Sequence, residues 1–82
     1  MSLKDYTYFS KPVTIPKDYE VMVQMLIDAR FSQNLSQELL ARKIGCTTSI
    51  VHKWETHKRI PSGFLLFCWL EALGYELKVT PR

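Results

Sequence analysis

Residues 35–55 read LSQELLARKIGCTTSIVHKWE, and this stretch decides the fold. Its pattern predicts two short helices joined by a tight turn. Ser36 and Thr47 are suited to cap them, because a hydroxyl side chain accepts a hydrogen bond from the unpaired N–H groups of a first helical turn. Gly45 lies between the two helices, where a sharp turn needs the left-handed backbone that glycine adopts without strain.

Four residues of the stretch set how the two helices cross. Ala41 is small enough for a close crossing, and Gly45 follows one helical turn later. Val51 and Trp54 stand at i and i+3 of the second helix, so both face inward. A small residue, a glycine, an aliphatic residue and a large apolar residue at these offsets are what a helix-turn-helix requires.

The same stretch resembles the Cro/phage-repressor (XRE-like) helix-turn-helix family. The positions that match in register are Leu35, Ser36, Gln37, Leu40, Ala41, Gly45, Val51, Trp54, Glu55, Arg59 and Pro61. The resemblance covers residues 21–74. It implies an all-α, compact four-helix helix-turn-helix domain whose third helix, residues 47–55, enters the major groove of double-stranded DNA.

Site residues follow from the resemblance position by position. It implies base contacts by Thr48, Ser49, His52 and Lys53. It implies phosphate contacts by Gln37, His57, Lys58 and Arg59. Arg30 and Glu55 occupy positions that family members often join as a structural ion pair, which fixes the third helix relative to the first. The sequence departs from the family at several places: Thr48 and Ser49 are shorter than the Gln or Arg often found there, and His57 replaces a frequent glycine. The largest departure follows Gly74, where many relatives continue into a fifth helix and this chain does not.

Before the motif, the sequence predicts an extended N-terminal arm over residues 1–17, because Pro12 and Pro16 oppose a helix. The helix-turn-helix domain then spans residues 18–74, and its first helix begins near Lys17 with Asp18 as a plausible N-cap. Helical spacing predicts that the buried stripe of this helix consists of Met22, Met25, Leu26 and Ala29.

After the motif, Ser62 is expected to cap a fourth helix that runs to about Leu73 and is closed by Gly74. Residues 75–82 alternate apolar and polar side chains, which predicts a short C-terminal β-strand. The fourth helix is apolar nearly all round, more than one small domain can cover. We therefore expect a homodimer whose interface includes Phe64, Phe67, Trp69, Tyr75, Leu77 and Val79. The alternative is that the N-terminal arm folds over Phe64 and Trp69.

The placement of charge favours a nucleic-acid partner, and an ordinary solvated surface is the alternative that charge alone leaves open. The formal net charge is +3, and residues 28–60 carry six basic against three acidic side chains, so the whole excess lies in this central stretch. Cys46 and Cys68 have no ligand-like spacing and are typical of reduced residues in a cytoplasmic protein, which the resemblance would make bacterial or phage-encoded. Neither a signal peptide nor a membrane span is expected.

The favoured function is a sequence-specific transcriptional regulator of repressor or Cro type, acting on a palindromic operator. One alternative is the antitoxin of a toxin–antitoxin pair, with a toxin protein as a second partner. Another is a helix-turn-helix protein-interaction module without DNA readout, because the first turn of the third helix carries only hydroxyl groups. The residues offer no metal-ligand set, no catalytic triad and no phosphate loop, so neither an enzyme nor a cofactor is expected.

Overall fold

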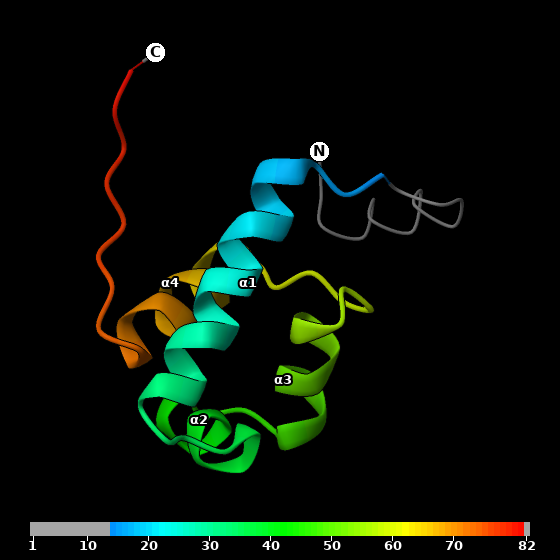
Figure 1. The fold of residues 1–82 in the computed structure, drawn as a ribbon, viewed down its shortest axis with the longest axis vertical. Helices are drawn as coiled ribbons and strands as arrows, with labels where there is room; N and C mark the ends of the chain where they lie inside the picture. Colours follow the sequence, from blue (N-terminus) through cyan, green and yellow to red (C-terminus); the bar gives the residue numbers. More distant parts are fainter. Residues whose placement is uncertain (1–13, 82) are drawn as a thin grey trace.

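The computed structural model describes residues 14–81, and these form four helices (Figure 1). Their bounds are α1 Lys17–Ser32, α2 Gln37–Ile44, α3 Thr48–Glu55 and α4 Gly63–Ala72. In the view of Figure 1, α1 runs across the front of the molecule and α2 lies at the lower end. Helix α3 lies on the right, on the side opposite the C-terminal chain. The predicted all-α, four-helix arrangement is confirmed. Most of the predicted N-terminal arm lies outside the described residues, and its last residue, Lys17, is already helical.

Hydroxyl caps fix the starts of three helices, as the sequence predicted. The capping side chains accept hydrogen bonds from the backbone N–H three residues later: Ser36 from Leu39 at 3.0 Å, Thr47 from Ile50 at 3.3 Å and Ser62 from Leu65 at 3.2 Å. Each bond satisfies one otherwise unpaired amide, which is worth about 1 kcal/mol per helix. Gly45 closes α2 with φ +96°, in the left-handed conformation expected for the turn.

The N-cap expected for α1 is wrong. Pro16, not Asp18, precedes the first helical residue, and no side chain caps this end. The Pro16 carbonyl accepts from the N–H groups of Tyr19 and Glu20, at 3.0 and 3.1 Å. The φ of Pro16 is −60°, which is compatible with the start of a helix, and α1 begins at Lys17, two residues earlier than a cap at Asp18 requires. Asp18 instead lies in the first turn, where its carboxylate complements the helix dipole.

The buried face of α1 is also shifted from the predicted stripe. Leu26 and Ala29 are buried as expected, but Val23 and Arg30 complete the face. Met22 is only half-buried, and Met25 is 54% exposed. The shift brings the charged Arg30 inward, where it meets Glu55 of α3.

Two tryptophans form the centre of the core. Trp54 of α3 and Trp69 of α4 are fully enclosed, and their ring centroids lie 5.2 Å apart at an interplanar angle of 32°. Leu40, Ala41 and Val51 pack in the same cluster, which confirms the inward face predicted for Val51 and the close helix crossing predicted at Ala41. The assignment of Trp69 to a dimer interface is wrong, because this side chain is 0% exposed and belongs to the core of its own domain.

The C-terminal tail, residues 75–81, is extended but forms no strand, and residues 14–81 contain no β-ladder anywhere. The predicted short strand is therefore wrong for the single chain. A strand needs a neighbour for its N–H and C=O groups, whereas the last backbone hydrogen bond in the described part of the chain joins Tyr75 N–H to Leu70 C=O at 2.9 Å. Among the described residues, no helix has the length and apolarity needed to cross a membrane.

Candidate nucleic-acid interface

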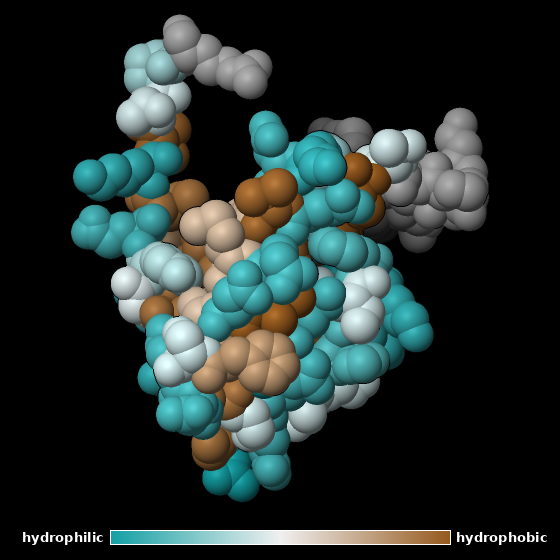
Figure 2. All heavy atoms as spheres, in the orientation of Figure 1, coloured by the Kyte–Doolittle hydropathy of each residue, from teal (hydrophilic) through white to brown (hydrophobic). Residues whose placement is uncertain are grey.

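One face of helix α3 is buried in the core, and the opposite face is exposed to solvent. The buried residues are Val51 and Trp54, at 0% and 1% exposure. On the outward side lie Thr48, Ser49 and His52, which are exposed, and Lys53, which is half-buried. The structure therefore brings together, on one face of α3, the four side chains expected to contact bases. The first turn of this helix is not covered by the rest of the described chain. Figure 2 shows a mostly hydrophilic surface on the side of the molecule where α3 lies.

A network of three side chains fixes α3 against α1 and α2. Arg30 donates twice to Glu55, from Nε to Oε2 at 2.7 Å and from Nη2 to Oε1 at 3.1 Å. Its Nη1 donates to the Leu35 carbonyl at 2.8 Å, and the Gln37 amide donates to Glu55 Oε1 at 2.9 Å. The Arg30 and Glu55 side chains are only 9% and 6% exposed. A bidentate, enclosed pair of this kind sets the angle of α3 rigidly.

The expected phosphate-contacting residues are divided between two places. Lys58 and Arg59 are exposed in the loop after α3, where both backbone N–H groups donate to the Lys53 carbonyl, at 2.9 and 3.2 Å. Gln37 is half-buried at the start of α2, and one of its two amide hydrogens is already committed to Glu55. A role of Gln37 in orienting Glu55 was not anticipated, because nothing in the local sequence shows that Gln37 and Glu55 lie side by side.

His57 differs from the other members of the expected phosphate-contacting set. Its backbone has φ +62°, the left-handed conformation that the family's usual glycine adopts easily. Its ring is turned toward Tyr19 of α1, with centroids 6.0 Å apart. His57 Nδ1 and Tyr19 Oη are both buried, and neither has a hydrogen-bond partner among the described residues. His57 thus packs the loop against α1, and sequence reasoning missed Tyr19 because its partner lies far along the chain.

Other charged and reactive side chains do not belong to the set of candidate DNA-contacting residues. Arg42 pairs loosely with Glu38 at 3.6 Å on the exposed face of α2. Cys46 is half-buried in the turn before α3, and burial raises the pKa of its thiol. In the part of the chain that the structure describes, no group of three or more His, Cys, Asp or Glu side chains is arranged to hold a metal ion.

Comparison with known proteins agrees with this geometry. A family model described as Helix-turn-helix matches residues 26–79, from the middle of α1 into the C-terminal tail. The match includes the whole of α2, the turn at Gly45 and α3. No curated protein and no solved structure gives a significant match.

Proposed function

Since the chain belongs to the helix-turn-helix family of the Cro/phage-repressor (XRE) type, we propose that it is a sequence-specific transcriptional regulator that reads an operator with α3 in the major groove. One observation supports this most directly. The polar face of α3 is free, while the opposite face and the end of the helix are held by Val51, Trp54 and Glu55. A rigid helix with a free leading turn is the geometry needed to reach base edges.

Readout is divided among the outward residues of α3. The ammonium group of Lys53 can donate to guanine O6 and N7, and the imidazole of His52 can reach a base edge or a phosphate. The hydroxyl groups of Thr48 and Ser49 can donate or accept, so they discriminate weakly and favour contacts through ordered water. Lys58 and Arg59 bind the adjoining phosphates, which supplies affinity that falls as salt rises.

The regulator is proposed to act as a homodimer on a palindromic site. Support comes from apolar side chains that remain open to solvent in the single chain: Phe64 at 73%, Phe67 at 44%, Tyr75 at 41%, Leu77 at 54% and Val79 at 91% exposure. Exposed apolar groups in this number are typical of a surface that is covered by another subunit. Two domains related by a twofold axis read half-sites roughly 34 Å apart, one turn of DNA.

A second function is that of an antitoxin that represses its own operon. The exposed Phe64 and Phe67 of α4 favour it, because in this alternative a toxin protein, and not a second copy of the chain, covers both rings. A third possibility, a helix-turn-helix interaction module without DNA readout, draws support from the short side chains of Thr48 and Ser49. Binding to DNA separates this last possibility from the other two.

The test is selection of bound duplexes from a random pool. A palindromic consensus is expected, whereas weak binding to all duplexes that vanishes with added salt would refute sequence-specific regulation. In the selected site, Lys53→Ala should relax preference at particular base pairs by about 1–3 kcal/mol. Arg59→Ala should weaken every site alike and reduce the salt slope by about one. Lys43→Ala, which removes an exposed charge of α2, is the matched control and should change neither.

A further inference from the structure

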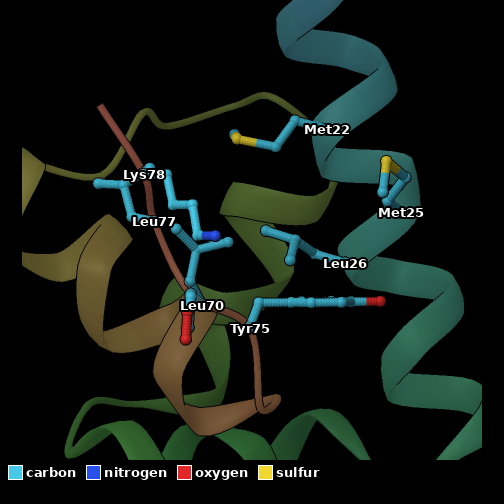
Figure 3. Close-up of a pocket in the computed structure, with 8 residues that line it drawn as sticks. Met22, Met25, Leu26, Leu70, Tyr75, Leu77 and Lys78 are labelled. Atoms are coloured by element: carbon cyan, nitrogen blue, oxygen red, sulfur yellow. The ribbon is translucent and has the colours of Figure 1, made fainter. Parts of the chain in front are cut away.

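An apolar groove runs between α1 and the C-terminal tail (Figure 3). Its volume is about 320 Å³, and α1 and α4 supply Met22, Met25, Leu26 and Leu70 to its walls. The tail forms the remaining wall, and Figure 3 shows the Tyr75 ring reaching from the start of the tail toward α1. In Figure 2, hydrophobic atoms are exposed between α1 and the tail. The volume is at the lower end of the range that small-molecule sites occupy.

One positive charge is directed into this groove. Figure 3 shows the amino nitrogen of Lys78 pointing from the tail toward α1, across the groove. The ion pairs among residues 14–81 lie elsewhere, and Glu76, which also lines the groove, forms none with Lys78. An ammonium group over an apolar surface favours a ligand that carries a negative charge on an apolar body, because charge complementarity selects the head group and apolar contact holds the rest.

We propose that the groove binds a small amphiphilic carboxylate, of the class that a medium-chain fatty acid represents. The apolar chain of the ligand lies against Met22, Met25 and Leu26, and its carboxylate pairs with the ammonium group of Lys78. A single lysine matches the single charge of a carboxylate. A phosphate favours the forked donors of arginine, and no arginine is among the described residues that line the groove.

The two methionines make the groove suited to a flexible chain. A thioether side chain is unbranched and adapts its shape to irregular apolar ligands. Met22 is half-buried and Met25 is 54% exposed in the single chain, so a ligand would cover apolar surface that water now contacts. In Figure 1 the tail and α3 stand on opposite sides of the four helices, so an occupied groove leaves α3 uncovered. Ligand binding can therefore be measured without DNA, and its result is independent of the proposed function.

Methyl NMR of the full chain, labelled at methionine, tests the site with decanoate as the probe. Decanoate should shift the Met22 and Met25 signals along one saturation curve. Decylammonium has a chain of the same length and the opposite charge, so its dissociation constant should be roughly tenfold higher, because an attraction to Lys78 becomes a repulsion of similar size. Acetate has the charge without the chain and should shift neither signal. Decylammonium that binds as tightly as decanoate, or decanoate that shifts neither signal, would overturn the proposal.

Removal of the positive charge tests the head-group contact. Lys78→Gln should raise the dissociation constant for decanoate by roughly three- to fivefold, which is what an exposed ion pair contributes. Lys43→Gln is the matched control, because it removes an exposed lysine of α2 that does not line the groove. Equal affinities of the two variants for decanoate would contradict the role of Lys78.

A carboxylate placed in the wall of the groove tests the apolar contact. Met25→Glu should raise the dissociation constant for decanoate by roughly tenfold or more, followed at the Met22 signal, because it sets a like charge against the ligand. Val21→Glu is the matched control: Val21 is also on α1 and is 48% exposed, but it does not line the groove. Equal losses in the two variants would refute the site. Methionine signals that respond to dilution of the protein and not to decanoate would show that a second copy covers the groove, which also overturns the proposal.

Discussion

Substitution Glu55→Gln tests the network that holds α3. The amide keeps the size of the carboxylate and one accepting oxygen, but it removes the charge opposite Arg30. Arg30 is 7% exposed, so its guanidinium would stay enclosed without a counter-charge. In addition, the new NH2 group would face the donors of Arg30 or Gln37, which now bond to the two carboxylate oxygens at 2.7–3.1 Å.

The expected loss is about 3 kcal/mol in the free energy of unfolding. Removing one partner of a buried pair costs about 3–5 kcal/mol, and the retained oxygen favours the lower end of that range. A domain of this size has a total stability of about 4–12 kcal/mol. The loss therefore lowers the melting temperature by about 12–24 °C, since each kcal/mol is worth about 4–8 °C at this length.

Urea and thermal unfolding followed by circular dichroism measure the loss. Glu38→Gln is the matched control, because Glu38 and Arg42 also form a carboxylate–guanidinium pair, but at 3.6 Å with side chains 66% and 72% exposed. Its effect should stay below about 0.5 kcal/mol. A loss below about 1 kcal/mol for Glu55→Gln would refute the structural role of the pair. At a temperature where the variant is folded, it should weaken binding to all duplexes equally, and a change confined to one base position would contradict the reasoning.

Three further changes probe the turn, the core and the titration of the fold. Gly45→Ala should destabilise the domain by about 1–2 kcal/mol through backbone strain alone, because φ is +96° and an added Cβ meets no atom within 4 Å; an unchanged urea midpoint would contradict this. Trp69→Ala should cost about 3–5 kcal/mol in unfolding free energy, whereas Phe64→Ser should leave stability nearly unchanged and alter only binding to other subunits or proteins. Burial raises the pKa of the Cys46 thiol above its ordinary value of 9.0, so the unfolded chain loses the thiol proton at a lower pH than the folded chain. The urea midpoint should therefore fall as pH rises through 9.0, and Cys46→Ser should make this fall smaller.

The helix-turn-helix was predictable because its rules are local. Ser36, Gly45 and Thr47 act on backbone groups within a few residues, so their hydrogen bonds and φ angles follow from sequence neighbours. The burial of Val51 and Trp54 follows from the helical period in the same way. The positions of the candidate base-contacting residues on one outward face required only this information.

The features that the sequence did not predict depend on long-range partners. Helical periodicity alone places only apolar residues in the buried stripe of α1, and this displaced the predicted stripe toward Met25, although the resemblance had already implied the pairing of Arg30 with Glu55 that brings Arg30 inward. Trp69 was assigned to an interface because α4 is apolar all round, and only the position of Trp54 shows which side of α4 is covered. The resemblance grouped His57 with Lys58 and Arg59 as phosphate contacts, although the His57 ring lies beside Tyr19 of α1, a contact that no local pattern shows.

The enclosed carboxylate of Glu55 also has a kinetic consequence. Because the ion pair already orients α3 in the free protein, docking on a duplex orders no backbone in α3. The entropic cost of association in this region then comes from immobilising long side chains such as Lys58 and Arg59, at about 0.5–1.5 kcal/mol each. Encounter is then governed by diffusion and attraction to the polyanion, at rates that are similar for right and wrong sites. Under the proposed function, discrimination between operators therefore appears in residence time, so that mismatched sites are left sooner and not found more slowly.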